Sequence, residues 1–344
     1  MKPTSLKLLC AGMATLMLVG QGHAASGDTV AAIKQRGELL CGVSTGVSTG
    51  MSTLDNQGQW KGFEVDFCRG LAAAILGDAG KVKWVPLEFK AAFATLQSGA
   101  ADVLARTATW SFSRNTELGL DWAGIYMYDG QGFMVSKKLG AKSAKDLNGA
   151  SICVSAGTTS ELNLADHFRA NNLKYTPIVG NTREQNQTNL ETGRCDVYSN
   201  ERGGLAASRT SMKTPGDWEI LPEVFSKEPL GPTVRKDDPK FKDIVMWTLN
   251  VIVATEEFGV TKANVVEMSA SSPNPEVQRM LGKTGDFGAK IGLANDWVVK
   301  VIQTTGNYAE LYDRHLGDGS AIKLARGPNM LWSKGGLLYS PPYR

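Results

Sequence analysis

The chain has few histidines, no run of like charges and, beyond residues 1–24, no long apolar segment. Only His167 and His315 follow those first residues, and neither accompanies a cysteine pair at the spacing of a zinc site. No candidate nucleophile is matched with a base, which argues against covalent catalysis. No stretch approaches the roughly 18 apolar residues of a membrane-spanning helix. These absences favour a soluble protein without metal or cofactor, and they do not indicate an enzyme.

The amino terminus is typical of a secretory signal peptide. Lys2 and Lys7 precede an apolar run over residues 8–19, and the segment ends with the small-residue sequence Gly-His-Ala at residues 22–24. Cys10 follows Leu9, where a lipidation site requires a small residue, so cleavage is favoured over a lipid anchor. We therefore expect cleavage near Ala24 and export of the mature protein.

The net charge limits the expected binding partners, and the chain length indicates how many lobes to expect. Removing Lys2 and Lys7 lowers the formal net charge from +3 to +1. A nearly balanced charge supplies no strong attraction to nucleic acid or acidic membranes, so neither is an expected partner. The remaining chain, about 320 residues, exceeds what one hydrophobic core usually supports. We expect two lobes.

Four cysteines remain after the signal segment, and an even number in an exported chain favours disulfides. Three pairings are possible in principle. Because two cysteines fall in the first third and two in the middle, the spacing favours Cys41 with Cys68 and Cys153 with Cys195, one bridge in each lobe. Each closed loop would contribute roughly 3 to 4 kcal/mol in the chain-entropy model.

A short internal sequence repeat, called the echo below, predicts two lobes that are built in the same way. Residues 96–103 read Leu-Gln-Ser-Gly-Ala-Ala-Asp-Val, and residues 190–197 read Leu-Glu-Thr-Gly-Arg-Cys-Asp-Val. Each copy ends a predicted helix at a glycine suited to a left-handed cap and then begins a strand. Strands and helices alternate around both copies, which predicts an α/β fold with mainly parallel sheets flanked by helices.

The chain order predicts how the lobes are divided. Residues 25–132 and 232–344 form lobe one, which includes a carboxyl-terminal extension, and residues 133–231 form lobe two. Two crossings, near residues 131–136 and 225–234, are predicted to make a two-segment hinge. A long helix over residues 239–257 returns the chain to lobe one, and residues 265–344 are expected to pack against that lobe.

The first candidate site is the stretch from Arg106 to Arg114, which follows a short apolar strand. Ligands of open α/β sheets bind outside the carboxyl ends of such strands. Arg114 offers a planar fork for a carboxylate, and Thr107 and Thr109 offer hydroxyl groups. The alternative is a surface ion pair of Arg114, which would have little energetic value.

The echo places a second candidate, Glu201, opposite the first. The segment that follows residues 196–199 in lobe two is equivalent to residues 107–114 in lobe one. A zwitterionic ligand between the lobes would therefore contact Arg114 through its carboxylate and Glu201 through its ammonium. The alternative is a local ion pair of Glu201 with Arg202, or an N-cap role for Asn200. Thr158 and Glu161 match a capping box, whose helix terminus also attracts anions.

A further segment, residues 44–53, is rich in serine, threonine and glycine and includes Ser48. It either touches the ligand from the end of the first strand or forms a solvated linker.

Together with further segments, these motifs make residues from about 29 to the end resemble periplasmic solute-binding proteins of ABC transporters for polar amino acids. The resemblance is closest to the general L-amino-acid-binding branch. The four cysteines and the ending Ser-Pro-Pro-Tyr-Arg fit that branch too. The segments that carry the match are Gly-Phe-Glu-Val-Asp (62–66), the motif 107–114, Asp-Gly-Gln-Gly-Phe (129–133), Gly-Thr-Thr (157–159), Gly-Arg-Cys-Asp (193–196) and Lys-Glu-Pro-Leu-Gly-Pro (227–232).

The resemblance implies a two-lobed periplasmic-binding-protein fold of the type II kind, which closes on a free L-amino acid and presents it to an inner-membrane ABC permease. A periplasmic location and a monomer are expected. The implied roles are a carboxylate clamp for Arg114, contacts to the ligand's main-chain groups for Thr107 and Thr109, further carboxylate contacts for Thr158 and Thr159, and the ammonium contact for Glu201.

Two departures from the family pattern bear on the ligand. The ammonium position, commonly Asp, is Glu201 here. Where binders of basic amino acids often have an aromatic residue in the first loop, the chain has none near Ser48, which leaves Phe89 as the nearest apolar wall. Residues 44–53 also lack an acidic residue for a cationic side chain, which favours a broad or a neutral-to-acidic range of amino acids. Two alternatives share the fold: a dehydratase-like enzyme with Glu201 as general acid, and a ligand-sensing partner of a receptor.

Overall fold

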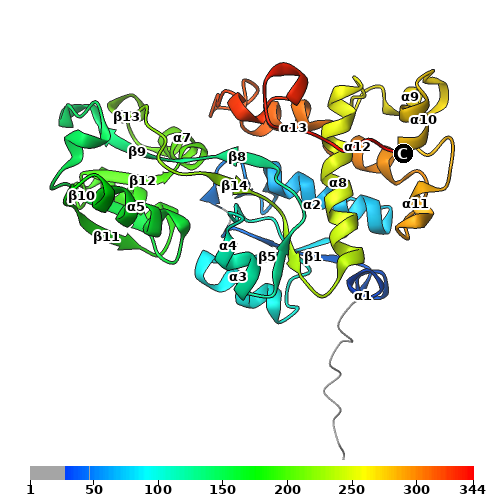
Figure 1. Cartoon of the computed structure of the whole chain (residues 1–344), viewed down its shortest axis with the longest axis horizontal. Helices are drawn as coiled ribbons and strands as arrows, with labels where there is room; N and C mark the ends of the chain where they lie inside the picture. The colour runs from blue at the N-terminus through cyan, green and yellow to red at the C-terminus, as the bar shows by residue number, and fades with distance from the viewer. Residues whose placement is uncertain (1–27, 46) are drawn as a thin grey trace, which may run out of the picture.

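Two five-stranded sheets, one in each lobe, form the framework of the protein in a computed structural model that describes residues 28–45 and 47–344. The two lobes lie side by side, with the strands and helices of residues 131–220 on the left of Figure 1 and the other labelled elements in its centre and on its right. The expected two-lobed α/β fold is confirmed. The predicted signal peptide, residues 1–24, lies outside the described residues.

The two sheets have matching strand orders. The sheet of lobe one has the order β5 (Val82–Pro86), β1 (Leu39–Val43), β6 (Val103–Leu104), β15 (Thr233–Arg235), β7 (Leu120–Trp122). The sheet of lobe two has the order β11 (Thr176–Gly180), β10 (Ser151–Ser155), β12 (Val197–Glu201), β9 (Gln131–Ser136), β13 (Trp218–Ile220).

Each sheet is mainly parallel, as expected, with one reversed strand at the same place in the order. β15 pairs antiparallel with both β6 and β7, and β9 pairs antiparallel with both β12 and β13. The remaining neighbours pair in parallel. The reversed strands are the ones that follow a crossing between the lobes, so the chain enters each sheet from the opposite end.

The crossings form a two-stranded antiparallel ribbon of β8 (Met127–Asp129) and β14 (Glu228–Leu230), which joins the lobes in the centre of Figure 1. A separate hairpin-like sheet, β2 (Val47–Ser48), β3 (Ser52–Leu54) and β4 (Trp60–Lys61), follows the first strand of lobe one. Residues 44–53 are therefore partly strand rather than a plain linker, because β3 pairs with both of its neighbours.

Helices flank both sheets. Lobe one has α1 (Thr29–Arg36), α2 (Phe63–Leu76), α3 (Phe89–Gln97), α4 (Phe112–Glu117) and α8 (Pro239–Glu257), and lobe two has α5 (Thr159–Ala170), α6 (Arg183–Glu191) and α7 (Arg202–Ser211). The extension adds α9 (Val265–Ser271), α10 (Pro275–Met280), α11 (Phe287–Lys290), α12 (Trp297–Thr305) and α13 (Tyr308–His315). Short 3-10 turns are η1 (Lys137–Leu139), η2 (Ala144–Leu147), η3 (Pro215–Asp217), η4 (Gly327–Asn329) and η5 (Trp332–Lys334).

The internal echo corresponds to equivalent units. Its first copy ends α3 and leads into β6, and its second copy ends α6 and leads into β12. Gly99 and Gly193 have φ of 77° and 73°, the left-handed conformation expected at the helix ends. Because β6 and β12 occupy the same place in their sheets, the segments that follow them lie at equivalent edges.

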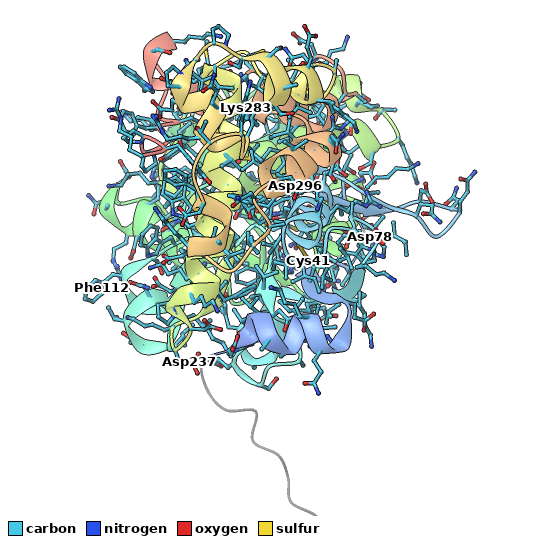
Figure 2. All side chains as sticks on the ribbon, turned by 90° about the vertical axis from the view of Figure 1, so that its right-hand side faces the viewer. Cys41, Asp78, Phe112, Asp237, Lys283 and Asp296 are labelled. Atoms are coloured by element: carbon cyan, nitrogen blue, oxygen red, sulfur yellow. A yellow bond between two sulfur atoms is a disulfide. The ribbon has the colours of Figure 1, made fainter. Side chains whose placement is uncertain are left out.

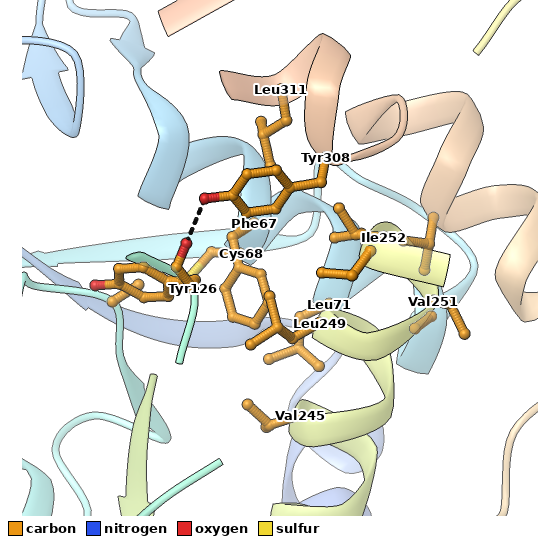
Figure 3. Close-up of a cluster of buried hydrophobic side chains, with 14 of the residues drawn as sticks. Phe67, Cys68, Leu71, Tyr126, Val245, Leu249, Val251, Ile252, Tyr308 and Leu311 are labelled. Carbon is orange, nitrogen blue, oxygen red and sulfur yellow. Dashed lines mark hydrogen bonds between the residues drawn. The ribbon is translucent and has the colours of Figure 1, made fainter. Parts of the chain in front are cut away.

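The carboxyl-terminal extension packs against lobe one, as predicted. Tyr308 and Leu311 of α13 lie in the same buried cluster as Phe67 of α2 and Leu249 of α8 (Figure 3). The Tyr308 hydroxyl donates a hydrogen bond of 2.7 Å to the Tyr126 carbonyl oxygen, next to the ribbon between the lobes. Burying these large side chains stabilises the extension through the hydrophobic effect.

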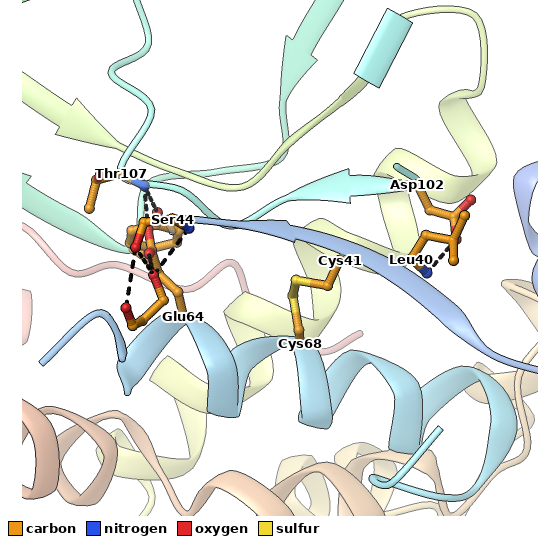
Figure 4. The surroundings of a disulfide bond; sticks show 9 residues. Leu40, Cys41, Ser44, Glu64, Cys68, Asp102 and Thr107 are labelled. Atoms are coloured by element: carbon orange, nitrogen blue, oxygen red, sulfur yellow. Dashed lines mark hydrogen bonds between the residues drawn. A yellow bond between two sulfur atoms is a disulfide. The ribbon is translucent and has the colours of Figure 1, made fainter. Parts of the chain in front are cut away.

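Both predicted disulfides are confirmed. Cys41 of β1 is bonded to Cys68 of α2 (Figure 4), and Cys153 of β10 is bonded to Cys195, just before β12. Each bridge therefore ties a central strand to a neighbouring element of its own lobe. Among the helices that the structure describes, none combines the length and apolar character needed to cross a bilayer.

Replacing Asp66 by asparagine is expected to remove a pH-dependent ionic interaction between α2 and α13. Arg314 Nη2 and His315 Nε2 lie 2.9 Å and 2.7 Å from Asp66 Oδ2. Burial raises the pKa of Asp66, but the hydrogen bonds and charges of His315 and Arg314 outweigh it and lower the pKa from 3.8 to about 2. The stability that Asp66 contributes is therefore present above pH 4 and lost as the pH falls towards 2.

Denaturant unfolding between pH 5 and pH 2 checks this prediction. The wild type should lose about 2 kcal/mol more unfolding free energy over that range than Asp66→Asn. Asp166→Asn is the matched control, because Asp166 forms an exposed pair with Arg169 that should contribute little. Parallel pH profiles for wild type and Asp66→Asn would contradict the assignment.

Candidate ligand-binding site

One pocket between the lobes is lined by all but one of the predicted site residues. Lobe one contributes Ser48, Phe89, Thr107 and Thr109, and lobe two contributes Thr158, Thr159 and Glu201. The pocket lies beyond the carboxyl ends of β6, β10 and β12, since Thr107, Thr158 and Glu201 follow or end these strands. This is the position that ligands occupy in open α/β sheets.

The exception is Arg114. Its guanidinium lies against the rings of Phe89 and Phe93, 5.0 Å and 5.1 Å from their centroids, and Nη1 donates to the Thr109 carbonyl oxygen at 3.0 Å. Burial lowers the pKa of Arg114, which the charge of Glu228 opposes. Aromatic stacking and the backbone contact thus hold Arg114 beside the pocket, behind Phe89 and Thr109.

The predicted motif divides between the pocket and the outer surface. Thr107 and Thr109 are buried at the pocket, whereas Trp110 is 38% exposed. Phe112, at the start of α4, is 83% exposed and projects from the surface of lobe one (Figure 2). Position in the motif therefore did not by itself indicate which side chains line the pocket.

A buried carboxylate that the sequence reasoning missed holds Thr107 in place. Glu64, in the first turn of α2, accepts a hydrogen bond from the Thr107 N–H (Figure 4) and another from the Tyr126 hydroxyl. Thr107 has a φ of 47°, an uncommon left-handed conformation for a β-branched residue. Burial raises the pKa of Glu64 while these hydrogen bonds oppose the shift. Glu64 thus positions a pocket residue without lining the pocket.

Arg183, at the start of α6, was also missed, and it crosses between the lobes. Its Nη1 donates to Ser48 Oγ at 3.0 Å, and its Nη2 lies 3.4 Å from both Thr107 Oγ1 and Glu201 Oε2. Burial raises the pKa of Glu201, and the charge of Arg183 opposes that shift. Glu201 therefore pairs with Arg183 and not with its neighbour Arg202, whose guanidinium donates to the Leu221 carbonyl oxygen at 2.7 Å.

Glu228 joins the lobes on the other side of the pocket. It lies on β14 of the ribbon, is 1% exposed, and accepts hydrogen bonds from Thr109 at 2.6 Å and Thr159 at 2.9 Å. Asn163 and Ser226 donate to its second oxygen at 2.7 Å and 2.8 Å. Because each threonine has a single O–H, both hydroxyls present acceptor lone pairs to the pocket.

Thr158 serves as the N-cap of α5, as one alternative predicted. Its hydroxyl accepts from the Glu161 N–H at 3.3 Å and donates to the Ser155 carbonyl oxygen at 2.7 Å. The Glu161 carboxylate accepts a hydrogen bond from the Gly157 N–H at 2.9 Å. A complete capping box would require the Thr158 N–H as the donor, so the expected box is only partly formed. The positive end of α5 therefore adjoins the pocket, which suits an anionic group.

The rest of the pocket wall is polar. Arg106 is the second guanidinium in it, and burial together with the charge of Arg183 lowers the pKa of Arg106 to about 10. Across residues 28–45 and 47–344, no cluster of three His, Cys, Asp or Glu side chains is arranged to hold a metal ion. The lining residues for which the sequence analysis proposed no individual role are Ser44, Thr45, Glu88, Arg106, Ser155, Asn181, Thr182, Arg183 and Glu184.

The chain is similar to proteins of known class over nearly its whole length. It is 48% identical over 340 residues to the general L-amino acid-binding periplasmic protein AapJ of Rhizobium johnstonii, covering 98% of this chain and 99% of that protein. It is 50% identical over 321 residues to the glutamate/glutamine/aspartate/asparagine-binding protein BztA of Rhodobacter capsulatus, covering 93% and 95%.

A solved structure agrees with these relatives. An ABC transporter periplasmic binding protein from Brucella ovis with glutathione bound superposes with a TM-score of 0.90 at 49% identity, covering 92% of this chain and 100% of that one. Residues 41–264 match the family model of the bacterial extracellular solute-binding proteins, family 3. The chain belongs to family 3 of the bacterial extracellular solute-binding proteins.

Proposed function

We propose that this protein captures free L-amino acids of a broad range in the pocket between its lobes and delivers them to an inner-membrane ABC permease. The observation that carries the proposal is the pocket itself, to which lobe two brings the Glu201 carboxylate and the positive end of α5. A zwitterion needs one anionic and one cationic partner at a fixed separation. The names of AapJ and BztA, which specify amino-acid binding, support the same ligand class.

In this proposal Glu201 receives the α-ammonium, with the lone pairs of Thr109 and Thr159 beside it. The α-carboxylate lies towards the amino terminus of α5, at Thr158 and Thr159, and is attracted by the positive end of the helix and not by the two hydroxyls, which already donate to Ser155 and Glu228. The positive charge of Arg114 lies beside Phe89. Thr107 contacts the main-chain groups from lobe one, and Phe89 and Ser48 complete the wall. Charge-assisted contacts of this kind are the strongest available to a small polar ligand.

The proposed motion is hinge closure of the two predicted lobes, residues 25–132 with 232–344 against residues 133–231. The ribbon of β8 and β14 is the element that would bend, because its two strands are the segments through which the chain passes between the lobes. Arg183 with Ser48, and Thr109 with Thr159 at 3.4 Å, make contacts between the lobes that an open form would break. Closure would then exclude water from the ligand.

The family is one of extracellular solute-binding proteins, so the chain is an exported protein. We propose further that the signal peptide is cleaved near Ala24, that the mature protein works as a monomer in the periplasm, and that no reaction occurs in the pocket. A dehydratase-like enzyme would need Glu201 as a general acid. Burial raises the pKa of Glu201, but Arg183, 3.4 Å away, opposes that shift and engages the carboxylate, which suits a binding role.

A thermal-unfolding screen of the ligand-free mature protein tests the proposal. Ligands would be the common L-amino acids, several D-amino acids, sugars, dipeptides and glutathione, which presents a free amino-acid head at its γ-glutamyl end. A ligand at 100 times its dissociation constant adds about 2.7 kcal/mol, which should raise the unfolding temperature by roughly a few degrees. Shifts with many L-amino acids are expected. If no L-amino acid raises the unfolding temperature, the proposal is refuted. Chemical conversion of a bound ligand would refute the statement that no reaction occurs in the pocket.

A further inference from the structure

The carboxyl-terminal extension is bonded to the strand through which the chain leaves lobe one. The Asn329 side chain pairs with the backbone of Tyr128 in β8, accepting from its N–H at 2.7 Å and donating to its carbonyl oxygen at 3.0 Å. Asn329 is buried, so water competes little for these two hydrogen bonds. The extension therefore binds one strand of the hinge ribbon through its backbone, as a neighbouring strand would.

The loop between α13 and η4 is fixed to the rest of lobe one. Arg326 forms two hydrogen bonds with the Glu256 carboxylate of α8, at 2.7 Å and 2.8 Å. The Tyr312 hydroxyl donates to the Ala325 carbonyl oxygen at 3.2 Å. A bidentate pair of arginine and carboxylate restricts both partners strongly, so the adjoining Leu324 extends from a rigid support.

From this support the extension reaches lobe two at the first turn of α7. A Cβ at Gly203 would lie 3.6 Å from Leu324 Cδ2, which is a van der Waals distance. The Gly203 N–H also donates to Asp129 Oδ2 of β8 at 2.9 Å. The same Cβ would lie only 2.8 Å from Met127 Cε and from Asp129 Oδ2, so a glycine is required for α7 to approach the ribbon this closely.

Any rotation of lobe two about the ribbon would change how these surfaces meet. Arg202 and Val224 of lobe two line one groove of about 530 Å³ with Leu324 and Leu337 of the extension. Rotation that widens the groove separates Leu324 from α7, and rotation that narrows it drives α7 onto a loop that is held in place. The contact therefore favours the arrangement of this structure, in which the lobes also meet across the ligand pocket.

We propose that the carboxyl-terminal extension stabilises the closed arrangement through Leu324 and the first turn of α7, and that it thereby sets the affinity for every amino-acid ligand without touching any of them. The inference rests on the proposed function, because binding must require the lobes to close. When only a fraction of the protein is closed, the apparent dissociation constant is the intrinsic one divided by that fraction. Weakening the contact lowers the fraction, so it weakens the binding of all ligands by one factor.

Calorimetric titration of Leu324→Ala with L-glutamate and L-alanine tests the contact. Both affinities should fall by the same factor, about 3- to 10-fold, and bound ligand should dissociate faster. Leu76→Ala is the matched control, because Leu76 is also partly buried against the core of lobe one but lies at the far end of α2. The control should lose unfolding free energy and keep both affinities, which separates the proposed role of Leu324 from a merely structural one.

Small-angle X-ray scattering supplies a measurement that needs no ligand. Ligand-free Leu324→Ala should have a larger radius of gyration than the ligand-free wild type, because a larger fraction of it is open. Equal radii of gyration, unchanged affinities, or losses that differ between the two ligands would overturn the proposal. If the wild type binds no amino acid, the proposed function fails, and the scattering alone decides whether the extension favours the closed arrangement.

Gly203→Ala provides the same comparison if Leu324→Ala fails to fold. Alanine favours the helical conformation of α7 more than glycine does, but its Cβ would press on Met127 and Asp129 and push α7 away from the ribbon. Affinity should again fall by one factor for both ligands. Gly216→Ala is the control, because a Cβ at Gly216 in η3 of the same lobe meets open space, and it should leave both affinities unchanged.

Discussion

Replacing Glu201 by glutamine is expected to weaken the binding of every amino-acid ligand by about 2 to 5 kcal/mol, which is at least roughly 30-fold in affinity. The α-ammonium is common to all these ligands, so the loss should not depend on the side chain. Glu201 is 6% exposed, and little water can replace the missing charge. The substitution also leaves Arg183 without its acidic partner, which adds to the cost.

Calorimetric titration with L-glutamate and L-alanine checks this expectation. Glu219→Gln is the matched control, because Glu219 pairs with Lys142 at the edge of the lobe-two sheet and does not line the pocket. The Glu201 variant should lose affinity for both ligands in similar proportion, because both carry the α-ammonium. Unchanged affinity for L-alanine would remove Glu201 from the ammonium site.

Removing the Cys153–Cys195 disulfide by a double serine substitution is expected to cost about 4 kcal/mol of unfolding free energy, and removing Cys41–Cys68 about 3.5 kcal/mol. The difference follows from the loops that the bridges close, with sequence separations of 42 and 27. A longer loop restrains the unfolded chain more. All four cysteines are buried, so the substitutions also exchange buried sulfur for a hydroxyl and add to the loss.

Denaturant unfolding under oxidising conditions measures these costs. A reductant should destabilise the wild type and each double variant that retains one bridge, but it should not further destabilise a variant that lacks all four cysteines. That insensitivity is the internal control. Equal unfolding free energies for the wild type and both double variants would contradict a stabilising role for the bridges.

Local features of the sequence predicted the architecture because they depend on near neighbours in the chain. The echo at residues 96–103 and 190–197 indicated equivalent helix-to-strand units, which lie at the same place in both sheets. Cysteine spacing favoured both observed pairings, since each bridge joins nearby elements of one lobe. The reversed strands were not expected, because only the crossings decide the direction in which the chain enters a sheet.

The site was predicted in part for the same reason. Thr107 and Glu201 follow or end central strands, and strand ends are identifiable from the sequence, which predicted that both residues line one pocket. Arg114 was expected to reach the ligand, and no local signal showed that Phe89 and Phe93 would hold its guanidinium. Nor did any motif single out Arg183, an arginine at the start of an ordinary polar helix.

The order of residues along the chain was enough to predict the alternation of strands and helices, the division into two similar lobes and the hydroxyl-rich segments at the strand ends. Which side chains contact one another depended on how the lobes pack in three dimensions. Glu64 contacts Thr107 across 43 positions, and Glu228 contacts Thr109 across 119. Arg183 contacts Ser48 across 135 positions. Such pairs arise when two sheets bring their strand ends together, and the energy of a buried charge depends on the burial and partners found there, which residue spacing along the chain does not specify.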